Sequence, residues 1–233
     1  MYTNFPMAFA LLIIFMLVAF GLTTLCRRWM DIPTLIAVAI GCAVNANIFT
    51  PIKYPIAIGD FVFSFEIVLY TLFMYTIVVR ILDYGYTDAK KMTLTSVAAI
   101  IISAFIELFA LLANRGFEAD VFKDFSLYVF SSIGTIVGVW VMILIVIQCR
   151  KKNISSYLII PFAIAASCLL HGFVYYGGMA LVFWSTDFYT FQLLLSTMLG
   201  KSVCTLLGVL CYFINQKFWK PLNLVSKEDN ANN

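Results

Sequence analysis

The sequence predicts an all-α membrane protein, a polytopic bundle of seven transmembrane helices with its N-terminus outside and its C-terminus inside. Composition is the first reason. Of 233 residues, 63% are hydrophobic and only 12% are charged, against about 25% charged in an ordinary soluble domain. Mean hydropathy is +0.97, which leaves too little polar surface to cover a soluble fold. The other two reasons are seven long apolar runs and an asymmetric distribution of lysine and arginine.

Each apolar run is about long enough to cross a bilayer whose hydrocarbon core is roughly 30 Å thick. Their connections are short, so we expect a single transmembrane domain over residues 1–221, followed by a polar cytoplasmic tail over residues 222–233. The first run lacks the basic flank of a cleavable signal and is expected to remain as a helix. The seven runs cover residues 6–26, 33–51, 58–82, 92–114, 125–149, 156–184 and 188–214.

The basic residues set the orientation. With the N-terminus outside, the inside segments hold eleven lysines and arginines and the outside segments hold three. This positive-inside bias requires an odd number of crossings. We expect a multi-pass protein of the inner (plasma) membrane. The inside set is Arg27, Arg28, Arg80, Lys90, Lys91, Arg150, Lys151, Lys152, Lys217, Lys220 and Lys227, and the outside set is Lys53, Arg115 and Lys123.

Lys201 is the most informative residue of the chain. It is the only formal charge in the last apolar run and lies near its middle. A lone cation at that depth costs about 2.5–3.5 kcal/mol on insertion scales, so its side chain should face a partner or a wet cavity.

Five further polar residues lie in the middle or outer half of the predicted spans. Two carboxylates lie about two turns from the outer ends of the third and fourth runs, the only histidine is near the centre of the sixth, and two asparagines lie in the outer part of the second. Such groups usually face the bundle interior and mark a substrate or ion path. With Lys201 they form the predicted substrate-binding set: Asn45, Asn47, Glu66, Glu107 and His171.

Each of these residues also has a purely structural interpretation. Glu66 and Lys201 would then be a buried ion pair that joins two helices, and His171 a hydrogen-bonded packing residue. The asparagines would join helices through hydrogen bonds worth about 0.6 kcal/mol each. Glu107 would lie at headgroup level if the fourth span were shifted.

The sequence carries no catalytic or cofactor motif. It contains no HExxH, GxSxG or glycine-rich phosphate loop, so we expect neither an enzyme nor a bound cofactor. The six cysteines lie in or beside apolar runs without a CxxC pair, which favours small packing residues over a metal site. No basic block of the nucleic-acid-binding type is present.

Several short motifs resemble those of the queuosine-precursor transporters, the vitamin-uptake-transporter-like family. The second span ends in Ala46-Asn47-Ile48, where the family has an alanine-asparagine-isoleucine motif. Ile58-Gly59-Asp60 is similar to its glycine-polar helix start, and the turn DYGYTDAKK at residues 83–91 to its acidic-tyrosine-glycine turn. Lys201 matches a lysine in the family's last helix. The resemblance covers scattered positions from Arg27 onward.

Two departures indicate a divergent member. Where the family has a Thr-Asp pair late in its third helix, this chain has Thr76 followed by Ile77. Where the family has a Gln and an Asp in its penultimate helix, this chain has His171 and Tyr175. The resemblance implies a membrane transporter, and these departures leave open whether the substrate is still a deazapurine.

The expected function is therefore uptake of a small, flat, polar metabolite, such as a queuosine precursor or another nucleobase-like or vitamin-like compound, through an outward-facing cavity. A substrate-binding subunit of an ATP-driven vitamin transporter is one alternative, and in that case the partner would be an ATPase module. A homodimer is also compatible with the sequence. A retinal-binding seven-helix light receptor or pump is another, although the residue one turn before Lys201 is Thr197 rather than an acid. A structural or assembly protein of the membrane is the third.

Overall fold

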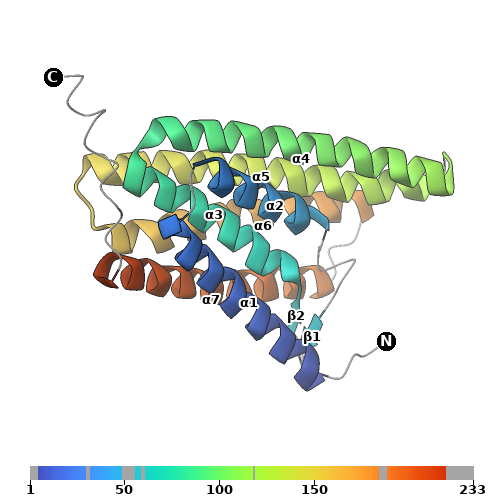
Figure 1. Cartoon of the computed structure of the whole chain (residues 1–233). Coiled ribbons are helices and arrows are strands. Elements are labelled where there is room, and N and C mark those ends of the chain that lie inside the picture. The colour runs from blue at the N-terminus through green and yellow to red at the C-terminus, as the bar shows by residue number, and fades with distance from the viewer. Residues whose placement is uncertain are drawn as a thin grey trace.

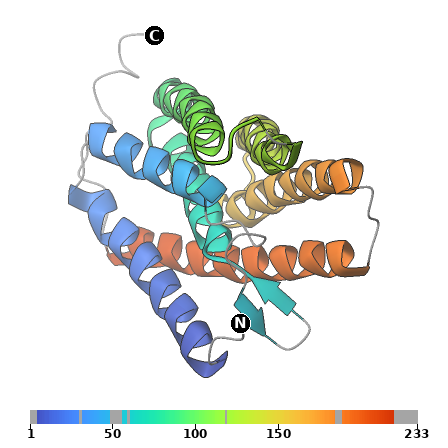
Figure 2. The ribbon, with the colours of Figure 1, turned by 90° about the vertical axis from the view of Figure 1, so that its right-hand side faces the viewer.

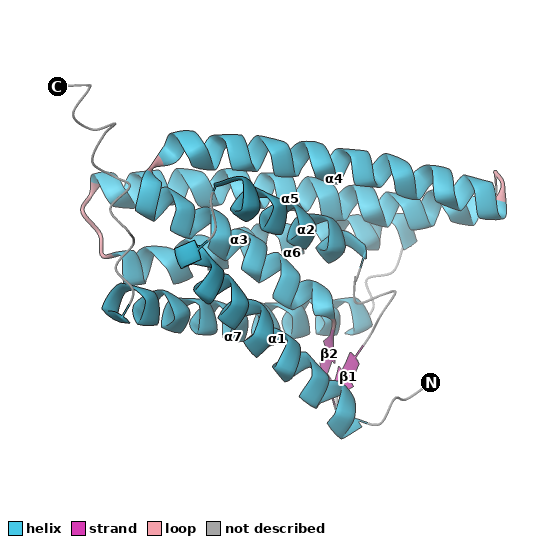
Figure 3. Cartoon of the chain, in the orientation of Figure 1, coloured by secondary structure: helices cyan, strands magenta, loops and turns pink. Residues whose placement is uncertain are grey.

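The computed structural model describes residues 5–29, 32–48, 56–58, 61–117, 119–183 and 188–218. These residues form seven helices and one short hairpin, and helix accounts for nearly all of them (Figure 3). The elements are α1 (Phe5–Trp29), α2 (Ile32–Ile48), β1 (Ile56–Ile58), β2 (Phe61–Phe63), α3 (Phe65–Tyr84), α4 (Tyr86–Arg115), α5 (Ala119–Lys151), α6 (Ser156–Phe183) and α7 (Phe188–Phe218). The predicted all-helical bundle is confirmed.

Five of the helices, α3 to α7, are long and apolar enough to cross a membrane, which makes the chain a multi-pass membrane protein. The described apolar parts of α1 and α2 are shorter, at residues 10–23 and 37–46. Successive helices run in alternating directions, so α1 begins at the end of the molecule opposite to the end of α7 (Figure 1). An odd number of membrane crossings would likewise place the two ends of the chain on opposite sides of the membrane.

The helix α3 is the centre of the bundle. It contacts each of the other six helices, and every residue from 70 to 81 is buried. In contrast, α4 lies at the periphery, beside α5 (Figures 1 and 2). Large apolar side chains such as Phe105, Ile106 and Phe109 remain exposed on α4, as expected for a face that contacts lipid tails. The turns after α3 and α4 pass through Gly85 and Gly116, whose positive φ angles of 88° and 71° suit glycine.

The third apolar run differs from expectation at its start. Instead of continuous helix from residue 58, the chain forms the antiparallel hairpin β1–β2, with Ile58 opposite Phe61, and α3 begins only at Phe65. Figure 2 shows the hairpin beside α7, and contacts between β2 and α7 support this placement. Glu66 is therefore in the first turn of α3, and the expectation that it lies two turns inside that helix is wrong.

A buried polar site on α3, α6 and α7

Lys201 lies near the middle of α7, and its side chain is 1% exposed. Its Nζ lies 2.9 Å from Oε1 of Glu66, whose side chain is 5% exposed, and 3.2 Å from Nδ1 of His171. The same Nζ lies 4.1 Å from the ring centroid of Tyr70. These four residues, Lys201, Glu66, His171 and Tyr70, are called the lysine cluster below. A buried charge needs such partners because an isolated ammonium ion out of water is strongly disfavoured.

Local helix geometry explains how α3 supplies two of these contacts. Glu66 and Tyr70 are four residues apart, so their side chains lie one above the other on the same face. Glu66 is in the first turn, where the partial positive charge of the helix N-terminus favours a carboxylate. The anion is thus stabilised from two directions, by the start of α3 and by the Lys201 ammonium group.

The contact between Lys201 and His171 identifies the tautomer of the imidazole. A lysine ammonium group has three donors and no acceptor, so the Nδ1 atom 3.2 Å away must accept a hydrogen bond. The proton of the neutral ring then lies on Nε2. The rings of Tyr70 and Tyr175 lie near the imidazole, with centroids 4.4 Å and 6.0 Å from that of His171. The cluster therefore combines one positive charge, one negative charge and several aromatic faces.

A second layer of contacts holds Tyr70 in place. Its hydroxyl lies 3.0 Å from Oγ of Ser167, and Ser167 in turn donates to Sδ of Met74 at 3.4 Å. Tyr70 is thus the donor in the first of these bonds. Ser167 and His171 are also four residues apart, so one face of α6 carries both partners of the α3 residues.

Two glycines of α5 allow α6 to approach closely. A Cβ atom on Gly134 would lie 3.1 Å from the backbone oxygen of His171, and one on Gly138 would lie 2.7 Å from Oγ of Ser167 and 2.8 Å from the hydroxyl of Tyr70. The GxxxG spacing therefore has the close-packing role that is usual for such motifs in membranes. Its close contacts are with the face of α6 that bears the site.

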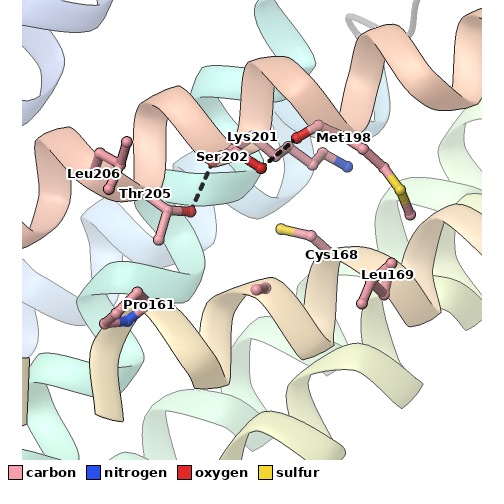
Figure 4. A pocket seen from close by; sticks show the side chains of 9 residues that line it. Pro161, Cys168, Leu169, Met198, Lys201, Ser202, Thr205 and Leu206 are labelled. Carbon is pink, nitrogen blue, oxygen red and sulfur yellow. Dashed lines mark hydrogen bonds between the residues drawn. The ribbon is translucent and has the colours of Figure 1, made fainter. Parts of the chain in front are cut away.

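A cavity of about 340 Å³ lies between α6 and α7, and Lys201 is part of its wall. Figure 4 shows the side chains of both helices around it. Two hydroxyls on the wall already donate to their own helix, Ser202 to the carbonyl of Met198 and Thr205 to that of Lys201. The other lining residues are Pro161, Ala165, Cys168, Leu169 and Leu206. A mostly apolar cavity with a few convergent polar groups is typical of small-molecule sites.

A second cavity of about 350 Å³ lies on another side of α7, among α1, β2 and α3. Its lining is apolar and includes Met16, Phe63, Ile67 and Cys204, with no charged side chain. This cavity can accommodate apolar groups but offers little to fix the orientation of a polar ligand.

The predicted site residues fall into two groups. The structure brings Glu66, His171 and Lys201 together within hydrogen-bonding distance. Asn45 is exposed and donates its amide to the carbonyl of Gly41, one turn earlier in its own helix. Glu107 is half-buried on α4, where it acts electrostatically on Tyr128 of α5. Neither residue belongs to the lysine cluster, and the side chain of Asn47 lies outside the described residues.

Sequence reasoning missed three contributors to the site: Tyr70, Ser167 and Cys168. The spacing of four residues that joins Glu66 to Tyr70, and Ser167 to His171, is visible in the sequence. It places each of these polar side chains on the same helix face as a residue already suspected. This signal identifies Tyr70 and Ser167 but not Cys168, which resembles any small apolar residue of the span.

No group of three or more histidine, cysteine, aspartate or glutamate side chains is placed to hold a metal ion within the part of the chain that the structure describes. Comparison of the chain with known protein families, with curated proteins and with solved structures gives no match.

Proposed function

We propose that this chain is a membrane transporter that takes up a small, flat, polar metabolite. The observation that carries the proposal is the lysine cluster, an ion pair buried in the middle of the bundle, beside a cavity large enough for such a ligand. Ionisable groups inside a membrane bundle are costly and usually mark a substrate or ion path. The motifs that resemble queuosine-precursor transporters make a deazapurine the first candidate substrate, ahead of other nucleobase-like or vitamin-like compounds.

The chemistry of the lysine cluster suits the edge of a heterocyclic base. Lys201 donates to a ring carbonyl, and Glu66 accepts from an amine or ring N–H, so the two residues recognise a donor next to an acceptor. The rings of Tyr70 and Tyr175 provide faces for stacking. A ligand that lacked either hydrogen-bonding group would leave a buried charge unpaired, which is the usual origin of strong discrimination by polar sites.

The test is ligand binding by the detergent-solubilised protein, with 7-deazaguanine as the probe. At 100 times its dissociation constant, a ligand adds about 2.7 kcal/mol to a reversible unfolding free energy. Lys201→Met should weaken binding at least tenfold, which corresponds to about 1.4 kcal/mol. Lys123→Met is the matched control, because Lys123 is half-exposed and pairs only at the surface with Asp120.

Two outcomes would contradict this proposal. One is a folded Lys201→Met variant that binds the probe as tightly as the unchanged protein. The other is the absence of any stabilisation across a panel of deazapurines, nucleobases, pterins and vitamins. Copurification of a partner ATPase would instead favour the substrate-binding subunit of an ATP-driven transporter, with the same role for the site.

A retinal-binding protein is the second candidate, favoured by one observation. A lysine in the last helix that lies 2.9 Å from a carboxylate of α3, next to a mostly apolar cavity, also suits a Schiff base with its counter-ion. In this case Lys201 would condense with the aldehyde and release water. Addition of retinal to the purified protein would then produce visible colour that the Lys201→Met variant does not develop, and an uncoloured sample would remove this candidate.

A further inference from the structure

Two of the three N–H groups of Lys201 already have a hydrogen-bond partner, and an aromatic ring lies against the ammonium group. Of its three N–H groups, one is directed to Glu66 and one to His171, and the Tyr70 ring lies over the group at 4.1 Å. A ligand that takes the place of the carboxylate at Nζ must therefore displace Glu66. The ion pair between Lys201 and Glu66 is intact in the structure, so a ligand that is recognised by both residues requires the pair to separate.

Building on the proposed function, we propose that Glu66 binds a proton and that this proton is transported together with the metabolite. In this step a proton from the outer aqueous phase binds a carboxylate oxygen of Glu66 and forms an O–H bond. The hydrogen bond from Nζ of Lys201 to Oε1 breaks, and no other bond changes. Lys201 then keeps its charge, and the released N–H can bind a carbonyl oxygen of the substrate.

Glu66 is a better proton acceptor in this arrangement than His171. The neutral imidazole has its free lone pair on Nδ1, the atom that accepts from Lys201 at 3.2 Å. A proton there would place two positive charges side by side in a buried site, a strongly unfavourable arrangement. A proton on Glu66 instead leaves a single cation, with the substrate carbonyl as its new partner.

The other titratable groups around Lys201 do not offer an equivalent acceptor. From α3 the neighbouring group is the Tyr70 hydroxyl, which donates to Ser167. From α6 it is the Cys168 thiol, and from α7 itself the Cys204 thiol, which donates to Sδ of Met16 in α1. The contact from β2 is the apolar ring of Phe63 against Gly200. Among the described groups that face Lys201, Glu66 is the only carboxylate.

A neutral Glu66 needs an acceptor for its new O–H group, and Ser64 is our candidate for this role. Ser64 lies two residues earlier, at the N-cap position of α3, and is fully buried. Its hydroxyl has no hydrogen-bond partner among the described residues and does not cap the helix. A buried hydroxyl without a partner costs about 1–3 kcal/mol, so a bond from protonated Glu66 would satisfy a group that the closed state leaves unsatisfied.

Proton binding at Glu66 can be tested without any substrate. Infrared difference spectra of the purified protein between mildly alkaline and mildly acidic pH should show the C=O stretch of a protonated carboxyl group. Glu66→Gln should abolish that band, and Glu66→Asp should move it if the Gln variant fails to fold. Glu107→Gln, which removes the carboxylate of α4, is the matched control and should leave the band unchanged.

The acceptor role of Ser64 gives a second measurement. Ser64→Ala should raise the C=O frequency of the Glu66 band, because the protonated carboxyl group loses its hydrogen-bond acceptor, and Ser64→Thr should restore it. A carboxyl band that persists in Glu66→Gln, or an acid response confined to imidazole vibrations, would overturn the proposal. Neither result depends on whether 7-deazaguanine binds.

Transport coupling is tested in proteoliposomes loaded with a pH dye. Uptake of 7-deazaguanine should carry about one proton per molecule, and a neutral substrate would then move positive charge inward. A folded Glu66→Gln variant should lose the dependence of uptake on the proton gradient. Uptake without proton movement in the unchanged protein would refute coupling while leaving the transporter proposal intact, and an absence of both binding and uptake would refute the transporter proposal alone.

Discussion

Gly138→Ala is the substitution whose consequences follow most directly from the structure. The added Cβ would lie 2.7 Å from Oγ of Ser167, 2.8 Å from the hydroxyl of Tyr70 and 3.0 Å from the backbone oxygen of Ser167. Because one of these atoms belongs to the backbone of α6, rotation of a side chain cannot relieve the contact, and α5 and α6 must separate. Overpacking of this kind typically costs about 1–3 kcal/mol.

Gly177→Ala is the matched control for this experiment. Gly177 lies inside α6, and a Cβ atom there would have nothing within 4 Å. Both substitutions gain the same helix propensity of about 1 kcal/mol, so the difference between the two variants isolates the packing cost. At roughly 2–4 °C per kcal/mol for a chain of this size, Gly138→Ala should melt between about 2 °C and 12 °C below Gly177→Ala.

The same variant tests the link between packing and the site. Displacement of Tyr70 would move the ring that lies against Lys201, so binding of 7-deazaguanine should weaken in Gly138→Ala. Adding Ser167→Ala removes one clashing atom, and the double variant should be less destabilised than the sum of the single variants. Equal melting temperatures for Gly138→Ala and Gly177→Ala would show that α5 and α6 are not in such close contact.

Three further predictions concern the pair, the cavity and the topology. Lys201→Met and Glu66→Gln should each destabilise the protein, because each removes one charge of a buried pair, and the double variant should regain most of that loss. Additive losses of unfolding free energy in chemical denaturation would argue against a coupled pair. Cys168→Leu places a larger side chain in the cavity beside Lys201 and should abolish binding of 7-deazaguanine. Cys204→Leu does the same in the second cavity and should preserve binding. The reverse pattern in a binding assay would indicate that the ligand binds in the second cavity. A tag at the start of the chain should be accessible from outside intact cells and a tag at its end only after permeabilisation, and two tags on the same side would contradict the odd number of crossings.

The helices were predictable because a membrane imposes a strong pattern on the sequence. A span must be apolar over most of its length, so composition alone separated all seven helices. The hairpin was not recognised because residues 56–63 are as apolar as the helix that follows, and periodicity does not distinguish a short buried strand from a helix. Gly59-Asp60 between IAI and FVF is the available signal, because a Gly-Asp pair between two β-prone runs favours a two-residue turn.

The site was partly predictable for a related reason. Depth along a span can be counted from the sequence, and depth was enough to select Glu66, His171 and Lys201. The side of a helix that faces a given neighbour depends on how the helices pack, which a single sequence does not encode locally. Glu107 was given the same depth as Glu66, yet α4 lies at the periphery and brings Glu107 near Tyr128 of α5 instead.

The late start of α3 connects the missed hairpin to the predicted site. If the helix had continued from residue 58, Glu66 would lie inside it, and the backbone N–H groups around Glu66 would already donate to carbonyl groups of the preceding turn. Because β2 ends at Phe63, the carboxylate lies in the first turn, where N–H groups have no intrahelical partner. That terminus is brought beside Lys201 at the middle of α7. Helix α3 contacts every other helix. A change in the charge of Glu66 would therefore occur on the helix that joins the rest of the bundle. The hairpin thus sets the position of Glu66 at the start of the one helix that contacts all the others.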